Sequence, residues 1–249
     1  MSTALPRLYT DLAPWFHLLT APDEYAEEAA FYQRTLTAAA ATPPRTLLEL
    51  GSGGGNMASH YKRHFTSTLV DLSPGMLALS QTINPECEHL QGDMRSVRLG
   101  RQFDAVLVHD AVIYLTTAAD LREAMTTAFV HCRPGGVVLF APDCVRETFR
   151  PQTDHGGHDG ATRSLRYLEW TRDADPTDST YEVDFVYVMH ERGRPLRVEH
   201  ETHTEGLFAR ADWLQWLTDA GFRVSITPLE HSEIEPGTQD VFVAVRALA

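Results

Sequence analysis

The sequence predicts a doubly wound α/β fold with a mostly parallel sheet, and two observations support this prediction. Short apolar segments with the pattern of buried strands alternate with amphipathic segments of helical period. Most of the apolar segments are nearly continuous, which is typical of parallel strands covered by helices on both faces. The expected strands are residues 46–50, 67–73, 87–93, 103–110 and 137–143, and the expected helices are residues 23–41, 56–65, 74–83 and 119–132.

A different pattern follows the fifth expected strand. Residues 150–163 are polar and rich in glycine, so we expect a loop there. The next segments alternate apolar and polar residues with period two, which predicts an antiparallel meander over residues 164–170, 179–191 and 195–208. Ligands of open α/β sheets bind beyond the carboxyl ends of the strands, so an insertion at this point would act as a lid. A helix over 210–222 and a last strand over 240–247 complete the expected fold.

The composition narrows the classes of partner. The formal net charge is −13, with 21 basic and 34 acidic residues, which argues against a protein that binds nucleic acid by neutralising phosphates. No apolar segment is long enough to span a membrane. The three cysteines are widely separated and indicate neither a disulfide framework nor a thiolate metal site. We therefore expect a cytoplasmic protein with a small-molecule partner, as a monomer or a homodimer.

The segment "GSGGG", residues 51–55, follows the first expected strand. Glycines at such a turn let the chain bend sharply and let a ligand approach the backbone amides. Gly51 and Gly53 fit the start of a G-x-G-x-x-G pattern, but Asn56 occupies the place of its third glycine. Counted from Gly53, the segment also gives G-x-G-x-x-A, which suits a dinucleotide enzyme. Two kinds of nucleotide cofactor therefore remain open.

Asp71 is the second cofactor candidate. It ends the second expected strand, 22 residues after Glu49 (71 − 49), where nucleotide-binding sheets carry the acid that accepts hydrogen bonds from ribose hydroxyls. The alternative is a helix cap before "LSPG", because aspartate commonly caps helices.

The ordered set of motifs separates the two cofactors. "ELGSGGG", "VDLSPGML", "QGDMR", "FDAVLVHDAVIYL" and "RPGG" follow one another at the spacings of the class I S-adenosylmethionine-dependent methyltransferases. The chain resembles this family over about residues 45–143 and its last helix and strand. The resemblance implies a Rossmann-like fold and S-adenosylmethionine as methyl donor, with S-adenosylhomocysteine as product. It also implies three parts: a helical lid segment (1–44), a cofactor-binding domain (45–143 and 206–249) and a β cap over the substrate (144–205).

The same resemblance implies a set of cofactor contacts. The methionine part would lie near Glu49, Gly51, Gly53 and Gly55, the ribose on Asp71 beside Leu72, and the adenine near Met76, Asp93 and the Met94 amide, with His109 lining the pocket. "RLYTDLAPWF" resembles the amino-terminal lid of small-molecule methyltransferases, in which Tyr9 would close over the cofactor. Each position has a structural alternative: a turn acid for Asp93, core packing for Met76 and a buried structural role for His109.

Methyl transfer is an in-line displacement, so alignment of the acceptor supplies much of the acceleration. An amine acceptor must be neutral and a hydroxyl benefits from a base, which makes pocket acids, histidines and tyrosines candidates. The candidate catalytic residues are Tyr114, His109 and Asp110, with Tyr9 and Tyr25 also available. Tyr114 has an alternative as an aromatic that packs at the strand end. We expect no metal site, because His200 and His203 point to opposite faces of a strand.

The segment 90–106 and the inserted strands resemble the aminosugar N,N-dimethyltransferases, which act on nucleotide-linked sugars. The chain departs from that pattern in "HDAVIYL", which is more polar, and in lacking an obvious diphosphate site. The arginines of the insertion are expected to form a solvated face instead: Arg163, Arg166, Arg172, Arg192, Arg194 and Arg197.

The sequence thus predicts an S-adenosylmethionine-dependent methyltransferase that acts on nitrogen or oxygen of a small molecule. Two alternatives stay open at this point. One is an NAD(P)-dependent oxidoreductase that uses Gly53, Gly55 and Ala58 with Asp71. The other is a non-catalytic partner protein that has kept the fold, since a fold alone does not guarantee activity.

Overall fold

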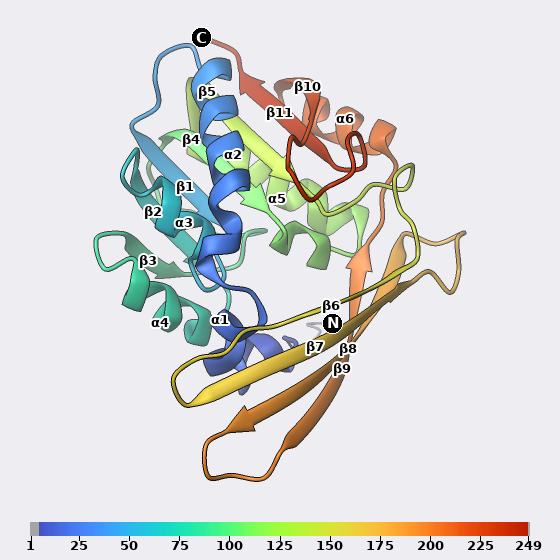
Figure 1. Ribbon diagram of the computed structural model, residues 1–249. Helices are drawn as coiled ribbons and strands as arrows, with labels where there is room; N and C mark the ends of the chain where they lie inside the picture. Colours follow the sequence, from blue (N-terminus) through green and yellow to red (C-terminus); the bar gives the residue numbers. More distant parts are fainter. Residues whose placement is uncertain (1–4, 249) are drawn as a thin grey trace.

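The computed structural model describes residues 5–248, which contain two separate sheets (Figure 1). The larger sheet has seven strands in the order β10-β11-β5-β4-β1-β2-β3. Its parallel strands are β1 (Thr46–Leu50), β2 (Thr66–Asp71), β3 (Glu88–Gln91), β4 (Phe103–His109) and β5 (Cys132–Ala141). Strand β11 (Asp240–Arg246) pairs antiparallel with both β5 and β10 (Phe222–Pro228). The expected doubly wound, mostly parallel sheet is confirmed.

Helices cover both faces of this sheet because successive residues of a strand point to opposite sides. Leu48 and Val106 face a layer that includes α5 (Ala118–His131) and α6 (Arg210–Asp219). Leu47 and Leu107 face the opposite layer, with α2 (Ala26–Ala39) and α3 (Asn56–Tyr61). The remaining long helix, α4 (Pro74–Ile83), follows β2 and begins at a Ser73 cap whose hydroxyl accepts from the Met76 amide.

The smaller sheet is the antiparallel meander, and we call it the cap. Its order is β6-β7-β8-β9, with β6 (Gln152–Gly156), β7 (Arg163–Arg172), β8 (Thr180–Glu191) and β9 (Arg197–Gly206). One face is apolar, as predicted from the alternation of Tyr181, Val183, Phe185 and Tyr187. This face turns toward the rest of the molecule and buries the amino-terminal residues described next.

The amino-terminal segment, residues 5–20, lies between the cap and the larger sheet, where Figure 1 shows α1 (Phe16–Leu19). Leu8, Leu12 and Trp15 pack with Leu165, Tyr187 and Met189 of the cap in one hydrophobic cluster. On the other side, His17 Nε2 lies 3.0 Å from the Gly54 carbonyl oxygen. The segment therefore contacts the glycine loop and the cap at once.

Four local expectations were wrong. The expected loop at 150–163 contains β6, an exposed edge strand whose polar side chains concealed its backbone pairing with β7. The strand β10 was overlooked, although "FRVSITP" alternates as an edge strand should. Helix α3 ends at Tyr61 instead of continuing to Phe65. Strand β5 already begins at Cys132, so the "RPGG" segment belongs to the strand rather than to a turn.

Two further observations concern membranes and cysteines. Within residues 5–248, no helix has the length and apolar character needed to cross a bilayer. The three cysteines are free, with Cys87 and Cys132 buried and Cys144 half-buried.

Candidate active site

The glycine loop leaves β1 with three glycines in the left-handed region, and each has its own reason. A Cβ on Gly51 (φ +83°) would lie 2.5 Å from the Ala111 Cβ, and one on Gly55 (φ +79°) would overlap Ser80 and Asn84. Gly53 (φ +52°) differs, because no atom comes closer than 4.0 Å to its Cβ position. The loop is therefore packed at its ends and open at Gly53, as a surface for a ligand requires.

Asp71 fixes this loop from the end of β2. Its Oδ2 accepts from the Gly53 amide at 2.8 Å, and its Oδ1 accepts from the Ser73 amide at 2.8 Å. Ser73, and not Asp71, caps helix α4. Asp71 is therefore not the helix cap that the sequence offered as its alternative role. Burial raises the pKa of Asp71, and the two amides oppose that rise. Each carboxylate oxygen of Asp71 keeps a free lone pair, so the two oxygens could accept hydrogen bonds from the two hydroxyls of a ribose.

Glu49 lies beneath the loop and is fully buried. Its Oε1 lies 2.8 Å from His109 Nε2, and its Oε2 accepts from the Tyr61 hydroxyl. Both oxygens are thus occupied within the protein. The arrangement gives Glu49 a supporting position behind the loop, rather than an open one beside it.

His109 and Asp110 end strand β4, as expected for pocket residues. Nδ1 of the buried His109 lies 3.2 Å from Asp110 Oδ1. Although burial opposes it, Asp110 and Glu49 raise the pKa of His109 well above its usual value. Asp110 has a φ of 43° and is the one non-glycine residue with positive φ in the described part of the chain. Such strain is common where a side chain must be held at a site.

The residues expected near the adenine have different environments. Met76 is fully buried in α4, which fits its core-packing alternative, whereas Leu72 beside Asp71 is 44% exposed. Asp93 accepts from the Arg95 amide at 2.9 Å and pairs with the Arg95 guanidinium at 2.6 Å. Hydrogen bonds from Arg95 lower the pKa of Asp93, and burial opposes this effect. Met94 packs against Gly51, where its Cε would lie 2.8 Å from an added Cβ.

A hydrogen-bond chain connects the amino-terminal segment, the larger sheet's side of the molecule and the cap. The hydroxyl oxygens of Tyr9 and Tyr114 lie 2.7 Å apart, and the Tyr114 hydroxyl lies 2.8 Å from His203 Nδ1. Tyr9 comes from the amino-terminal segment, Tyr114 from the 3-10 helix η4 (Ala111–Tyr114) and His203 from β9. The structure brings together two predicted site residues and adds His203, whose face of the strand the alternation did indicate.

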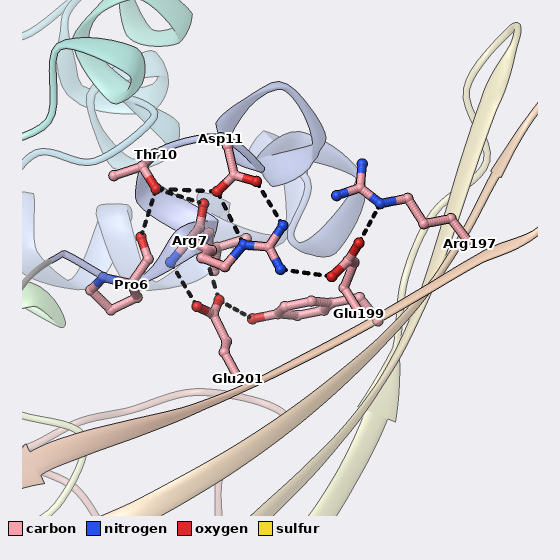
Figure 2. Close-up of polar contacts among 9 residues, drawn as sticks. Pro6, Arg7, Thr10, Asp11, Arg197, Glu199 and Glu201 are labelled. Carbon is pink, nitrogen blue, oxygen red and sulfur yellow. Dashed lines mark hydrogen bonds and ion pairs between the residues drawn. The ribbon is translucent and has the colours of Figure 1, made fainter.

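Glu201 and Glu199 hold the amino-terminal segment on the cap (Figure 2). Glu201 Oε2 accepts from the Arg7 amide at 2.7 Å, and its Oε1 accepts from the Leu8 amide at 3.0 Å. Glu199 pairs with the Arg7 guanidinium at 2.6 Å. No sequence motif marks these contacts, because the partners lie more than 190 residues apart.

Further acids interact electrostatically with Asp110, and sequence reasoning missed them. Burial raises the pKa of Glu28 to about 7, with Asp110 adding to the rise. Burial also raises the pKa of Glu205 to about 7, although the Tyr181 hydroxyl and His203 act to lower it. The surface of Asp143 is partly reached by solvent. The protein atoms around its carboxyl group nevertheless desolvate it and, together with Asp110 and Glu205, raise its pKa well above its usual value. Glu28, Asp110, Asp143 and Glu205 therefore form an acidic cluster.

Within residues 5–248, Glu28, His109 and Asp110 bring possible ligand atoms within 4.8 Å of one another. His109 lies between the carboxylates of Glu49 and Asp110, an arrangement that suits an imidazolium. The absence of a metal stays a prediction.

The arginines of the cap are engaged with neighbouring groups. Arg172 pairs with Glu182 and Asp184, and Arg163 pairs with Glu191 at 3.1 Å. The remaining contacts are Arg166 with Asp159, Arg194 with Glu191, Arg197 with Glu199, and Arg192 with the Ala161 carbonyl oxygen. These contacts fit the expected solvated face.

Comparisons with known proteins identify the class. A family model described as "Methyltransferase domain" matches residues 47–136. The dTDP-3-amino-3,4,6-trideoxy-alpha-D-glucopyranose N,N-dimethyltransferase of Streptomyces venezuelae is 31% identical over 207 residues, which cover 81% of this chain and 83% of the relative. The dTDP-3-amino-3,6-dideoxy-alpha-D-glucopyranose N,N-dimethyltransferase of Streptomyces fradiae is also 31% identical, over 82% of this chain and 78% of the relative.

Solved structures agree. The crystal structure of Streptomyces venezuelae DesVI superimposes with a TM-score of 0.79 and 27% identity, covering 98% of this chain and 100% of that one. The chain belongs to the S-adenosylmethionine-dependent methyltransferases, in the family that includes the aminosugar N,N-dimethyltransferases. Its cofactor is S-adenosylmethionine, and both the oxidoreductase and the non-catalytic alternatives are set aside.

Proposed function

We propose that this enzyme methylates an amino group of a small sugar acceptor bound between the glycine loop and the cap. The observation that carries the proposal is a cluster of carboxyl groups. Possible ligand atoms of Glu28 and Asp110 lie within 4.8 Å of each other, and Asp110 acts electrostatically on both Asp143 and Glu205. Carboxyl groups crowded in this way favour a cationic partner, because an ammonium group relieves their mutual repulsion. A neutral hydroxyl acceptor would leave that repulsion in place.

The cofactor is proposed to lie on the glycine loop, with its ribose hydroxyls on Asp71. The open position at Gly53 and the free lone pairs of Asp71 support this placement. Leu72 offers exposed apolar surface for the adenine, and Asp93 and the Met94 amide stay our candidates for its polar edge. The remaining proposed contacts are Tyr9, Gly51, Gly55 and His109. Glu49 and Met76 are fully buried, so their proposed part is to support the loop and helix α4 from behind. When bound, S-adenosylmethionine supplies a methyl group activated by a positively charged sulfur.

The protein's contribution is proposed to be alignment of the acceptor. The amino-terminal segment contacts both the glycine loop and the cap, so it closes the space from one side. Tyr114, His109 and Asp110 lie at the end of β4, where an acceptor nitrogen must approach the methyl group. Holding the two reactants in line converts a bimolecular reaction into an effectively unimolecular one.

The division into a lid segment (1–44), a cofactor domain (45–143 and 206–249) and a cap (144–205) is part of this proposal. We also infer a cytoplasmic enzyme, because its cysteines are unpaired and disulfides persist mainly in oxidising compartments.

The test is incubation with S-adenosylmethionine and two acceptors, followed by mass spectrometry. The first acceptor is dTDP-3-amino-3,6-dideoxy-α-D-glucopyranose, and the second is its 3-hydroxy analogue. We expect the amine to gain one or two methyl groups and the hydroxyl analogue to gain none. Methylation of the hydroxyl analogue with an unchanged amine would overturn the proposal.

A further inference from the structure

The hydrogen bonds between Tyr9, Tyr114 and His203 can run in either direction, and the tautomer of His203 selects one of them. His203 is buried, and its Nε2 lies 3.2 Å from Glu201 Oε1. Glu201 also accepts from the Arg7 and Leu8 amides and from the Tyr187 hydroxyl at 3.1 Å. A carboxylate with so many donors stays ionised. Nε2 lies at ion-pair distance from it without hydrogen-bond geometry, so the electrostatic attraction of the carboxylate is what favours a proton on Nε2. Nδ1 is then left with its lone pair.

That tautomer determines the direction of the next two hydrogen bonds. With Nδ1 as acceptor, the Tyr114 hydroxyl must donate to it across 2.8 Å. The Tyr114 oxygen can then accept from the Tyr9 hydroxyl across 2.7 Å. The Tyr9 oxygen is left as the free acceptor at the end of the chain. Both tyrosines are half-buried and border the space that we assign to the acceptor.

We propose that Tyr9, Tyr114 and His203 form a relay that takes the proton of the acceptor ammonium, with Glu201 as its counter-ion. This inference rests on the proposed function, since it requires an amine acceptor. The acceptor N–H bond breaks as its proton passes to the Tyr9 oxygen. The Tyr9 proton passes to Tyr114, and the Tyr114 proton passes to His203 Nδ1. The acceptor becomes a neutral amine, and the positive charge resides on an imidazolium beside Glu201.

The acidic cluster makes a proton acceptor for the substrate ammonium necessary. Carboxylates that attract an ammonium also stabilise its protonated form, which cannot attack a methyl group. The charged and titratable groups around His203 are Glu201 and Glu205 of β9, Glu169 of β7, Tyr114 of η4 and Tyr9 of the amino-terminal segment. Three of these are acids, so the positive charge that the relay delivers to His203 lies beside carboxyl groups of two strands. Tyr9 is the residue that touches the acceptor, and Glu201 is a positioning residue.

The first test does not depend on turnover. Nitrogen-15 NMR of the full chain, saturated with S-adenosylhomocysteine, reports the protonation of each histidine nitrogen. We expect neutral His203 to carry its proton on Nε2. A proton on Nδ1 would contradict the relay, because His203 would then donate to Tyr114 and could accept nothing from it.

The second test uses the pH dependence of methylation of dTDP-3-amino-3,6-dideoxy-α-D-glucopyranose. Removal of a proton acceptor typically costs about 10²-fold in rate, so we expect His203→Gln and Tyr114→Phe to lower kcat by about that factor near neutral pH. The loss should shrink as the pH rises above the pKa of the amine. His200→Gln is the matched control, since His200 lies on the same strand but is exposed on the other face.

The outcomes separate the two proposals. A kcat defect of His203→Gln that is equal at all pH values would overturn the relay, even with normal N-methylation by the wild type. If the wild type methylates no amine, the proposed function fails, and the relay fails with it because no ammonium is deprotonated. In that case the NMR result still shows whether His203 is oriented by Glu201 as described.

Discussion

The two sides of the active site are built differently. The proposed cofactor side, Gly51–Gly55 with Asp71, follows two neighbouring strands, and Asp71 accepts hydrogen bonds from amides no more than 18 positions away. The acceptor side joins Tyr9, Tyr114 and His203, and its hydrogen bonds connect residues 89 or more positions apart. The first is a local motif, whereas the second exists only once the chain has folded. The difference teaches that the proposed cofactor contacts are local in the sequence, whereas the proposed acceptor contacts join distant parts of the chain.

The largest expected effect tests how tightly the cofactor side is packed. Gly55→Ala should destabilise the protein by about 2–5 kcal/mol, from left-handed strain and from overlap with Ser80 and Asn84. Gly193→Ala is the matched control, because Gly193 has the same φ of +79° with nothing within 4 Å. It should lose only about 1–2 kcal/mol. Equal losses in urea unfolding would show that crowding at Gly55 contributes nothing.

These differences also explain how far the sequence could predict the structure. The glycine loop, Asp71 and the alternating strands were predictable, because local geometry requires glycine at positive φ and apolar residues at buried positions. Glu201 gave no such signal, since its partners are backbone amides of Arg7 and Leu8 at the far end of the chain. Strand β6 was concealed for a related reason: its pairing uses only the backbone.

The second prediction concerns the effect of the buried Glu205 carboxyl group, on the proposed acceptor side, on the stability of the protein. The carboxyl of Glu205 has a pKa of about 7 in the folded protein and about 4.5 when unfolded. The folded state therefore binds more protons between these values, and stability falls as the pH rises from 4.5 through 7. Glu205→Gln should raise the free energy of unfolding at pH 8 by up to about 3 kcal/mol, with little change at pH 4.

Glu199→Gln on the same strand is the control for this prediction. Hydrogen bonds from Arg197 and Arg7 lower the pKa of Glu199, so its contribution is present at high pH and is lost on acidification. The variant should therefore lose stability at pH 8, which is the opposite sign. Urea unfolding at both pH values measures these changes in the free energy of unfolding. If both variants lost stability at pH 8, the account of Glu205 as a destabilising buried carboxylate would be contradicted.

A smaller effect tests the ribose assignment. Asp71→Ala should lose about 1–3 kcal/mol of affinity for S-adenosylhomocysteine, the cost of leaving buried polar groups unpaired. Calorimetric titration measures it, with Asp184→Ala on the outer face of the cap as a control of unchanged affinity. Undiminished binding by Asp71→Ala would leave Asp71 as a tie between Gly53 and Ser73 only.

The smallest effect is expected outside both sides. Arg194 pairs with Glu191 at 3.3 Å, but its side chain is 73% exposed. Surface ion pairs of this kind contribute little, so Arg194→Ala should change stability by less than about 0.5 kcal/mol. Thermal unfolding and methylation rates should both match the wild type, and a clear loss of activity would place an acceptor contact on this edge of the cap.

The most direct measurement is a pair of calorimetric titrations of the wild type, one with S-adenosylhomocysteine and one with NADH. The structure has an open glycine loop beside an aspartate with two free lone pairs, within a methyltransferase family. We expect saturable binding of S-adenosylhomocysteine and no measurable heat with NADH. Binding of NADH without binding of S-adenosylhomocysteine would contradict the assignment of the loop on which the whole account depends.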